Sequence, residues 1–493
     1  MTKLENALYR GEQIRFCEQQ AVNLYHIDSI DLMNQAGTEA FFFLMRMYPD
    51  VKHVAVFCGA GNNAGDGYVL ARLAHEHGLS VTVYQCKALE DLPSAARQSA
   101  LLALSAGVEC QSADEPIDSE VELIVDALLG LGLKGPVQGI IANAIQQINA
   151  SGLPVLALDV PSGLNADTGQ VENVCVKADK TLTYIARKTG LYTLDGSDYC
   201  GDVHCRYLQL DATMSKIAPY ATLLDAQDLP LPIAPRKKNS HKGDYGHVLV
   251  IGGGEGMPGA VGLTAKAALR AGAGKVTIAT WPEHVASMIP LLPEAMISAV
   301  KTAKDLAPLL EKATVCVIGP GLGENDWAKT LFLTAISSQL PMVIDASALR
   351  LLAEHPQVDD EWILTPHPGE AGHLLSCSTD AVQADRYKAV ADIQQQYGGV
   401  VVLKGNGTLI QTSERKTFVC PLGNPGMATA GMGDVLSGII AGLCAQNFSL
   451  ADACKVGVWA HALAGDLTAA SQGAIGILAS DLIEKLPNIL NNR

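Results

Sequence analysis

Short apolar runs alternate with longer segments of mixed polarity along most of this chain. In the first half, apolar runs occupy residues 53–61, 80–86, 122–130 and 154–163, with helix-like segments between them. Runs of this length that end in Gly-rich turns are typical of buried strands, and their alternation with helices predicts a mainly parallel sheet covered on both faces. Two further runs, KTLTYIA and DVHCRYLQL, predict edge strands.

A second series of the same kind begins at HVLVIGGG (247–254). It continues through KVTIAT, ATVCVIGPGLG, PMVIDASAL, EWILTPHPGE and GVVVLKGNGTLIQT, and helices rich in Ala, Gly and Leu close it. The stretch between the two series mixes Pro, charged and polar residues, as linkers do. We therefore predict a Rossmann-like, doubly wound α/β domain over 1–222, a linker over 223–245 and a second α/β domain over 246–493. The basic run 236–238 is interpreted as solvated.

Composition narrows the partners that the chain can have. Its 493 residues exceed what one compact core holds, in agreement with two domains. The formal net charge of −16 argues against nucleic acid or an acidic membrane surface as a partner, because either requires a basic footprint. An anionic ligand would then be held by backbone N–H groups and helix N-termini.

Localisation is indicated by the N-terminus and the cysteines. The first twenty residues are charged throughout, unlike a signal peptide, and no run of eighteen apolar residues occurs. The 12 cysteines lie mostly inside apolar runs, which indicates reduced thiols in the cytoplasm. Cys200, His204 and Cys205 lie close together, but their spacing fits no zinc pattern.

The motif CGAGNNAGDGYVLA (58–71) places a Gly- and Asn-rich turn between a predicted strand and a predicted helix. In a doubly wound sheet this is where ligands bind, and its glycines would let the backbone approach a phosphate closely. A tight turn with an N-capped helix is the structural alternative. Taken alone, the motif does not decide between the two.

Two other strand ends favour a ligand site. Asp126 opens DALLGLGLKGP (126–136), and Asp159 precedes Pro161 and Ser162 in LALDVPSGLNADTG (157–169). Polar residues at three strand ends converge on one edge of a parallel sheet, so we predict one site built from all three.

The motifs GNNAGDG, DALLGLGLKGP and LDVPSGLNADTG resemble those of the NAD(P)H-hydrate epimerase domain and span the first predicted domain. The resemblance implies Asp159 as the acid–base residue and a potassium ion held by Asn63, Asp126 and Ser162, oxygen ligands that suit a hard cation. The family usually has Gly where Ala64 stands. The residues implied for hydrate binding are Asn62, Asn63, Ala64, Gly65, Asp66, Gly130, Leu131, Gly132, Leu133, Lys134, Gly135, Pro136 and Asp159.

In the second half, GGGEGMPGAVG (252–262) contains a literal G-x-G-x-x-G between a strand and a helix. Alone it would indicate a dinucleotide-binding oxidoreductase, with Glu283 as the candidate ribose-binding acid. Trp281 and Pro282 crowd that strand end, and a lone fingerprint is weak. No Walker A sequence occurs.

NPGMATAGMGDVLSGIIAG (424–442) is far more specific. Glycines and small residues lead into an apolar helix with Asp434 in its first turn. In ribokinase-type kinases, a G-x-G-D segment of this form stabilises the transferred phosphoryl group with backbone N–H groups and the helix dipole, and its Asp is the base for the substrate hydroxyl. An ordinary helix start is the alternative, which fits the density of Gly and Pro less well.

Three other strand ends add candidate ligands. KGNGT (404–408) places Lys404 where it can reach nucleotide phosphates, although a Gly-rich hairpin turn is the alternative. GPGLG (319–323) and TPHPGE (365–370) form two more loops, and we predict that the second displays His367 to a cleft.

Together, HKGDYGHVLVIGG, GMPGA, GPGLG, LTPHPGE, KGNGT and NPGMATAGMGDVLSG resemble the ADP-dependent NAD(P)H-hydrate dehydratase family. The resemblance implies a ribokinase-like fold, ADP with Mg²⁺ as co-substrate, and hydrate contacts from Ala260, Gly321, His367 and Asp434. The residues implied for ADP are Lys404, Gly405, Asn406, Gly407, Thr408, Asn424, Pro425, Gly426, Met427, Ala428, Thr429, Ala430, Gly431, Met432 and Gly433. The domain order matches the bifunctional repair enzymes, whose substrates are NADH and NADPH hydrates. We also expect a homo-oligomer.

The implied chemistry is consistent with such a site. Hydroxide leaves a reduced nicotinamide ring poorly, whereas a phosphate made from the terminal phosphoryl of ADP leaves well and gives AMP. The second domain would dehydrate the S hydrate and the first would interconvert R and S. Two alternatives stay open: a ribokinase-like small-molecule kinase fused to a non-catalytic binding module, and an NAD-dependent oxidoreductase.

Overall fold

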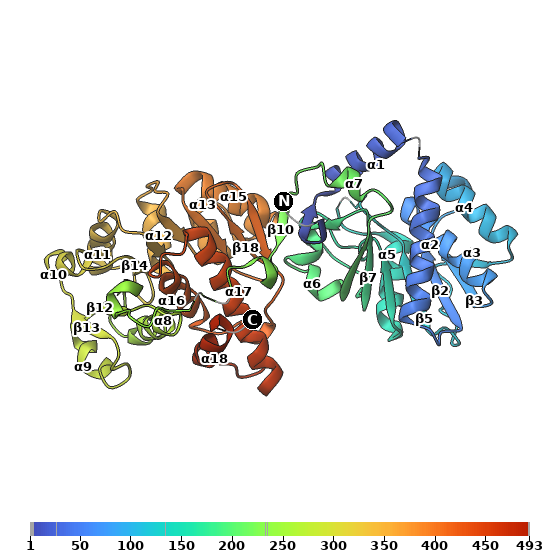
Figure 1. Cartoon of the computed structure of the whole chain (residues 1–493). Coiled ribbons are helices and arrows are strands. Elements are labelled where there is room, and N and C mark those ends of the chain that lie inside the picture. The colour runs from blue at the N-terminus through green and yellow to red at the C-terminus, as the bar shows by residue number, and fades with distance from the viewer. Residues whose placement is uncertain (1–3, 26, 134, 232, 234, 492–493) are drawn as a thin grey trace. The chain divides into compact units, whose positions relative to one another are not determined.

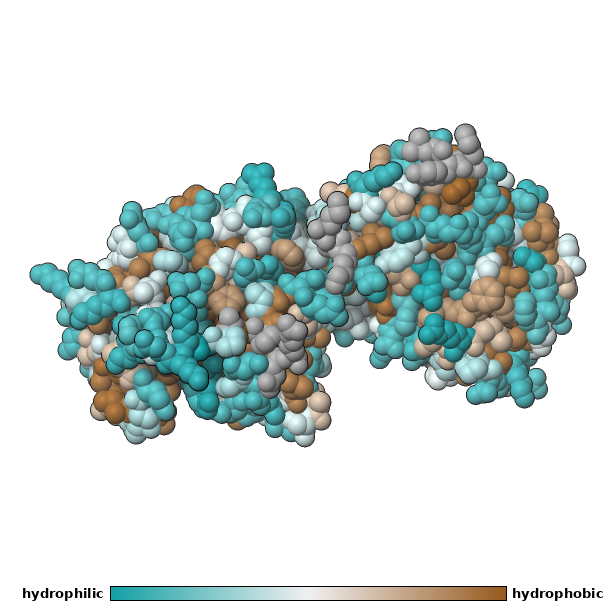
Figure 2. All heavy atoms as spheres, in the orientation of Figure 1, coloured by the Kyte–Doolittle hydropathy of each residue, from teal (hydrophilic) through white to brown (hydrophobic). Residues whose placement is uncertain are grey.

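The structure, a computed structural model, describes residues 4–25, 27–133, 135–231, 233 and 235–491. The chain forms two compact units, one ending at Thr222 and one beginning at Leu223 (Figure 1). Figure 2 shows hydrophilic side chains over much of the visible face of each unit, with hydrophobic ones in scattered groups. Among the described residues, no helix has the length and apolar character needed to cross a membrane.

The first unit contains a parallel sheet in the order β4-β3-β2-β5-β6-β7-β9. Successive strands run outward in both directions from the boundary between β2 and β5, which is therefore the switch point where doubly wound sheets bind ligands. The strands are β2 (His53–Cys58), β3 (Ser80–Gln85), β4 (Glu109–Ser112), β5 (Leu123–Ala127), β6 (Val155–Leu158), β7 (Lys180–Tyr184) and β9 (Asp202–Arg206). This arrangement confirms the predicted doubly wound fold.

Helices cover both faces of this sheet. Val54 and Val56 share a core with α2, α3 and α4, whereas Ala55 and Phe57 share one with α5, because successive strand residues point to opposite faces. The helices are α1 (Gly11–Tyr25), α2 (Ser29–Met47), α3 (Asn62–Glu76), α4 (Ser94–Ser105), α5 (Gly139–Ser151), α6 (Gly196–Tyr199) and α7 (Asp211–Met214), and the 3₁₀ turns are η1 (Leu4–Asn6), η2 (Leu89–Asp91) and η3 (Thr189–Tyr192).

Of the two strands predicted to lie at the edge of the first sheet, only one does. β9 lies at the edge, but β7 lies between β6 and β9. The two threonines of β7 are buried with hydrogen-bond partners: Thr181 donates to the Cys200 carbonyl at 2.7 Å, and Thr183 accepts from Lys188 at 2.7 Å. Three short strands outside the main sheet, β1 (Ala7–Tyr9), β8 (Arg187–Lys188) and β10 (Ala221–Leu223), pair with each other around β1.

The second unit contains a larger sheet whose strands follow the order β13-β12-β11-β14-β15-β16-β17-β18-β19. The first seven are parallel and the last two antiparallel, and the switch point lies between β11 and β14. The strands are β11 (His247–Ile251), β12 (Lys275–Thr280), β13 (Met296–Ala299), β14 (Val315–Ile318), β15 (Met342–Ile344), β16 (Trp362–Leu364), β17 (Val400–Leu403), β18 (Thr408–Gln411) and β19 (Thr417–Cys420).

Helix α16 (Met432–Cys444) packs closely on α8 (Pro258–Arg270). A Cβ at Gly438 would lie 2.2 Å from the carbonyl oxygen of Thr264, so only glycine permits this approach, which fixes the N-terminus of α16. The other helices are α9 (Val285–Met288), α10 (Ala303–Leu310), α11 (Asp326–Ile336), α12 (Ser347–Glu354), α13 (Pro368–Leu375), α14 (Thr379–Ala384), α15 (Arg386–Tyr397), α17 (Leu450–Gln472) and α18 (Ala479–Asn491), with 3₁₀ turns η4 (Ala226–Asp228), η5 (Lys242–Tyr245), η6 (Pro282–His284) and η7 (Pro425–Met427).

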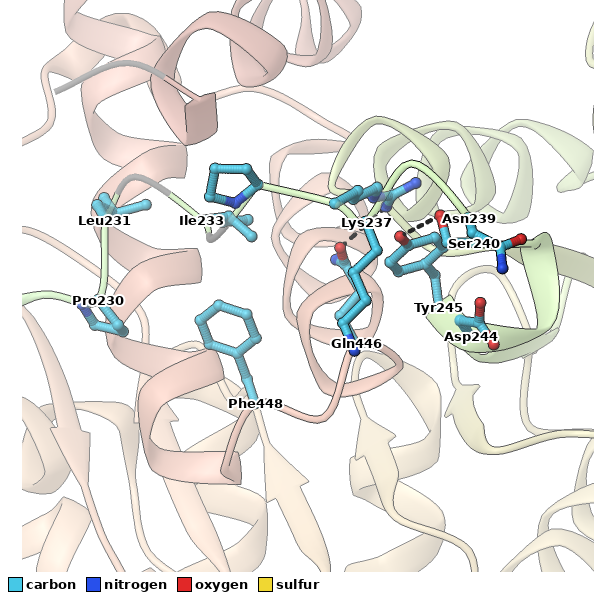
Figure 3. A pocket seen from close by; sticks show the side chains of 12 residues that line it. Pro230, Leu231, Ile233, Lys237, Asn239, Ser240, Asp244, Tyr245, Gln446 and Phe448 are labelled. Carbon is cyan, nitrogen blue, oxygen red and sulfur yellow. Dashed lines mark hydrogen bonds between the residues drawn. The ribbon is translucent and has the colours of Figure 1, made fainter.

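Residues 223–245, interpreted above as a linker, make ordered contacts within the second unit. Leu224 and Leu229 belong to its hydrophobic core. Residues 236–238 are exposed, as predicted for a solvated run. The Arg236 guanidinium also donates to the Gly272 carbonyl and lies 3.6 Å from the centre of the Tyr245 ring. The stretch also lines a cavity of about 900 Å³, which Gln446 and Phe448 line as well (Figure 3).

These contacts lead to a prediction about fragments. Expressed separately, 1–222 and 223–493 are each expected to fold, whereas 246–493 should be less stable than 223–493. Loss of buried Leu224 and Leu229 removes about 1.5–3 kcal/mol of apolar burial for each side chain. Denaturant titration followed by circular dichroism tests this, and equal midpoints for the two C-terminal fragments would contradict it.

Candidate active sites

The carboxyl edge of the first sheet borders a cavity of about 590 Å³ at the switch point. Residues from α1, α2 and α3 and from the loops after β2, β5 and β6 line it. Its charged and amide-bearing lining residues are Arg15, Glu18, Asn62, Asn63, Asp66, Asp159 and Lys188. The cavity thus contains both hydrogen-bonding and acid–base groups.

Asn63 connects the three strand ends of this site. From the first turn of α3, its amide nitrogen donates to the carbonyls of Leu129 at 2.8 Å and Leu158 at 3.0 Å. Its Oδ1 is buried and has no hydrogen-bond partner among the residues that the structure describes. A buried amide oxygen without a donor costs free energy, so a cation would be a suitable partner for it.

Asp126, at the carboxyl end of β5, is fully buried. Its carboxylate accepts hydrogen bonds from the Ser162 hydroxyl at 2.6 Å, the Ser162 N–H at 2.8 Å and the Leu128 N–H at 3.1 Å. Burial raises the pKa of Asp126 to about 6, although the hydrogen bonds from Ser162 and Leu128 act to lower it. The Ser162 hydroxyl oxygen accepts from the Leu129 N–H at 2.8 Å, which joins Asp126 to the network of Asn63.

These three side chains fit a hard cation. They offer a buried carboxylate, a hydroxyl oxygen and, among the described residues, an amide oxygen that lacks a donor. Such a set of oxygens suits a hard cation rather than a soft, thiophilic metal. The described part of the chain has no group of three or more His, Cys, Asp or Glu residues that could hold a metal.

Asp159 and Lys188 form a buried ion pair at the cavity. Asp159 follows β6 with a φ of 66°, a left-handed conformation that is uncommon for a residue with a Cβ and is often found at functional sites. The Lys188 ammonium also donates to Thr183 Oγ1 and to the Tyr184 carbonyl, each at 2.7 Å. Lys188 therefore provides Asp159 with a fixed counter-ion.

Two further carboxyl groups line the same cavity. Asp66 lies in α3, and Glu18 in α1. Burial and the nearby Asp159 raise the pKa of Asp66 well above its usual range. The same two causes raise the pKa of Glu18, although Lys188 and Arg15 oppose them. This cavity therefore holds two carboxyl groups whose pKa is raised by burial and by a neighbouring carboxyl group.

The second site lies at the carboxyl edge of the second sheet, around Lys404. Lys404 follows β17, and its ammonium lies 2.8 Å from Asp345 Oδ1 and 3.7 Å from Glu370 Oε2. Asp345 follows β15 and accepts a hydrogen bond from Ser437 of α16 at 2.7 Å. Burial opposes ionisation of Asp345, but Lys404 and Ser437 outweigh it and lower the pKa of that carboxyl. These contacts fix the lysine beside the start of α16.

Asp434 lies in the first turn of α16. Burial and the nearby Asp345 and Glu370 raise its pKa to about 7, whereas Lys404 lowers it. A carboxyl group that titrates near neutral pH can accept a proton and release it again, as a general base must. The neighbouring Gly433 brings the backbone close to the lysine, because a Cβ there would lie 3.2 Å from Lys404 Nζ.

Hydrogen bonds from side chains hold the loops around this site in place. Asn424 caps η7, accepting from the Gly426 N–H at 3.0 Å and donating to Asp466 at 2.9 Å. KGNGT joins β17 and β18 as an antiparallel hairpin, the alternative that the sequence left open. Arg386 is buried beneath it and donates to the carbonyls of Leu403 at 3.4 Å and Lys404 at 3.3 Å.

The similarity of this chain to known proteins covers both units. Residues 248–488 match the family model described as NAD(P)H-hydrate dehydratase, and residues 29–190 match the model of the YjeF-related protein N-terminus. The chain is 49% identical over 485 residues to the bifunctional NAD(P)H-hydrate repair enzyme Nnr of Coxiella burnetii, covering 98% of this chain and 99% of that one. It is 40% identical to the Nnr enzyme of Escherichia coli, covering 99% and 95%.

The chain belongs to the family of bifunctional NAD(P)H-hydrate repair enzymes. A solved structure supports the fold: a ribokinase-like superfamily protein from Enterococcus faecalis is 29% identical, with a TM-score of 0.50, and the match covers 55% of this chain and 95% of that one. The predicted ribokinase-like fold of the second unit and the two-part enzyme are confirmed. The oxidoreductase alternative suggested by the G-x-G-x-x-G motif is therefore dropped.

About half of the residues predicted to bind hydrate in the first unit line one cavity. Asn62, Asn63, Asp66 and Asp159 line it, and so do the residues 130–132. Ala64 and Gly65 are buried and are not among its lining residues, nor are Leu133, Gly135 and Pro136. Lys134 lies outside the described residues.

The glycines of the 58–71 motif have another role than the one predicted for them. A Cβ at Gly59 would lie 1.8 Å from the Leu128 carbonyl oxygen, and one at Gly65 would lie 2.2 Å from the Met33 sulfur. A Cβ at Gly67 would lie 2.7 Å from the Ala127 Cβ. These three glycines therefore permit close packing within the protein, and only Gly61 has open space around its α-carbon.

In the dehydratase unit of this family member, the predicted hydrate residues lie at two places. Gly321 is adjacent to Ala260, since a Cβ at Gly321 would lie 3.2 Å from the Ala260 Cβ. His367 is exposed and caps α13, since its Nδ1 accepts from the Gly369 N–H at 3.0 Å. Its display to a cleft stays a prediction. The Nε2 of His367 lies 3.4 Å from Glu370, which links it to the Lys404 cluster.

Sequence reasoning missed several residues of both sites. Asp345 directly follows the apolar run PMVI, which is the same signal that identified Asp126. Lys188 had no such signal, because it lies in a two-residue strand and meets Asp159 only through the tertiary fold. The other missed residues are Glu18, Glu370, Arg386 and Ser437.

Proposed function

We propose that the first unit interconverts the R and S hydrates of NADH and NADPH and that the second unit dehydrates the S hydrate with ADP. The observation that carries the proposal is Asp434, a carboxyl group with a pKa of about 7 at a helix N-terminus beside the half-buried Lys404. We assign the epimerase domain to 1–222 and the dehydratase domain to 246–493, joined by 223–245.

In the dehydratase reaction, Asp434 takes the proton of the ring hydroxyl. The hydroxyl oxygen then attacks the terminal phosphorus of ADP, and the bond between the two phosphoryl groups breaks to release AMP. The ring nitrogen next supplies an electron pair that expels phosphate, and loss of a proton from the neighbouring carbon restores the ring double bond. The N-terminus of α16 stabilises the charge on the transferred phosphoryl group.

ADP is assigned to the hairpin 404–408 and to the segment 424–433. Lys404 supplies a positive charge, and the N–H groups at the start of α16 supply donors for phosphate oxygens. Magnesium would bind with ADP and neutralise its phosphates. The hydrate is assigned to Ala260, Gly321, His367 and Asp434.

In the epimerase unit, Asp159 is assigned as the acid–base residue, in contact with hydrate bound by residues 62–66 and 130–136. Potassium is assigned to Asn63, Asp126 and Ser162, where the unpartnered Asn63 oxygen and the buried Asp126 carboxylate support it. A bound cation there would compensate the buried charge and hold the ends of β2, β5 and β6 together. The cytoplasmic location and the homo-oligomer stay predictions.

The whole proposal is tested by incubating the chain with a mixture of both hydrates of NADH, ADP and Mg²⁺. Full return of the dihydronicotinamide absorbance is expected, with AMP and phosphate formed in equal amounts. If the absorbance returns only to the share of one epimer, the chain has dehydratase activity but no epimerase activity. No return, with a stable phosphorylated product, would favour the small-molecule kinase alternative.

The raised pKa of Asp434 also predicts how dehydration depends on pH. A base works only when ionised, and its pKa of about 7 means that protonation removes activity as the pH falls through neutrality. From pH 8 to pH 6, kcat/KM for the S hydrate should therefore fall about tenfold. Initial rates with purified S hydrate at saturating ADP check this, and a flat profile over that interval would contradict it.

A further inference from the structure

The epimerase cavity holds three carboxyl groups, whereas its buried lysine has no donors to spare. The Lys188 ammonium has three N–H donors, and its three acceptors are Asp159, Thr183 and the Tyr184 carbonyl. Within the described part of the chain, the side chains of Asp66 and Glu18 have no hydrogen bond and no ion pair. Asp159 is therefore compensated, and the other two carboxyl groups are not.

Lys188 is the buried counter-ion of this cavity, whereas the other cation of its lining, Arg15, is exposed and donates to the Leu131 carbonyl. Carboxyl groups that share a cavity with one buried counter-ion cannot all be ionised. Asp159 has this counter-ion, so the proton is expected on one of the two carboxyl groups without an ion pair. Asp66 is the better placed of the two, because it lies in the first turns of α3 at the same sheet edge as Asp159. Its backbone is fixed as well, since a Cβ at Gly37 of α2 would lie 2.8 Å from the Asp66 carbonyl oxygen.

We propose that Asp66 is the general acid of the epimerase site and that it works as a pair with Asp159, the general base. This assignment rests on the proposed epimerase function and adds a second catalytic residue to it. A pair of this kind can open and close the ring, because the carbon that carries the hydroxyl is bonded to the ring nitrogen.

The step balances without a further reactant. Asp159 takes the hydroxyl proton, the oxygen forms a carbonyl, and the bond between that carbon and the ring nitrogen breaks. The released electron pair goes to the nitrogen, which takes the proton of Asp66. Rotation turns the aldehyde, and the nitrogen then attacks its other face. The nitrogen returns its proton to Asp66 and the oxygen recovers one from Asp159, so both residues end as they began.

The test is Asp66→Asn in the full-length chain, followed as conversion of purified R hydrate to S hydrate without ADP. Asparagine keeps the size and hydrogen-bond donors of a protonated Asp but cannot release a proton. We expect kcat for epimerisation to fall about 100-fold or more with KM changed by less than about threefold. Asp66→Glu, which retains an acid, should keep a kcat at least about tenfold above that of Asp66→Asn. Dehydration of S hydrate by the same preparation is the internal control for folding and should match wild type.

The outcomes separate this inference from the proposed function. A wild-type chain that does not accelerate epimerisation overturns the proposed function itself. If wild type is active, a normal kcat in Asp66→Asn, or a rise in KM alone, overturns only the role of Asp66 as an acid. Equal kcat values for the Asn and Glu variants would also overturn it. Glu18→Gln is the matched comparison. If it lowers kcat as much as Asp66→Asn does, Glu18 rather than Asp66 would be assigned as the general acid.

Discussion

Replacing Asp434 with Asn is expected to lower kcat for S-hydrate dehydration at least about 100-fold while leaving ADP affinity within a few-fold of wild type. Asn has nearly the same volume, so the first turn of α16 and its N–H groups are kept. What is lost is the base, which burial and two neighbouring carboxylates maintain near a pKa of about 7. Single-turnover assays with S hydrate and calorimetric titration of ADP measure the two quantities.

Ser437→Ala is a useful comparison for that variant. Ser437 lies one turn further along α16 and donates to Asp345, away from the hydroxyl that Asp434 is assigned to deprotonate. Its removal should weaken the support of Lys404 and affect ADP affinity more than the pH profile. If Asp434→Asn turned over at nearly the wild-type rate, Asp434 would have no place in the mechanism.

The second large effect is expected from Asp159→Ala, which should restrict repair to one hydrate. With a mixture of both epimers, ADP and Mg²⁺, wild type should restore the dihydronicotinamide absorbance in one phase. The variant should show a fast phase equal to the S share and then a slow tail set by spontaneous epimerisation. The fast-phase rate should not change, because the dehydratase site lies in the other unit.

Folding must be controlled in this experiment. Asp159→Ala leaves Lys188 buried without its counter-ion, and breaking a buried ion pair in this way typically costs about 3–5 kcal/mol. Asp159→Asn, which keeps hydrogen-bond acceptors for the lysine, is the second variant and should give the same two phases. A single complete phase in both variants, at early times, would return the first unit to the role of a binding module.

The strands were predictable because the signal is local. A continuous apolar run such as 53–58 must be covered on both faces, and both sheets therefore follow from the sequence. The edge position predicted for β7 was wrong because the order of strands in a sheet depends on their pairing in space, and β7 lies between β6 and β9. The glycines of the 58–71 motif were misjudged for a related reason: sequence shows that a glycine is present, but not which atoms approach it.

By itself, the sequence determined the two α/β units, the order of their motifs and the family, since these depend on local pattern and on matches along the chain. It also placed Asp126, Asp159, Lys404 and Asp434 at strand ends or at a helix start. Only the tertiary structure decided which charges meet. Lys188 lies 29 positions from Asp159 and Lys404 lies 59 positions from Asp345, yet each pair is in contact. The protonation of Asp66 and Asp434 follows from such contacts and from burial, which depend on distances in space that no local pattern encodes.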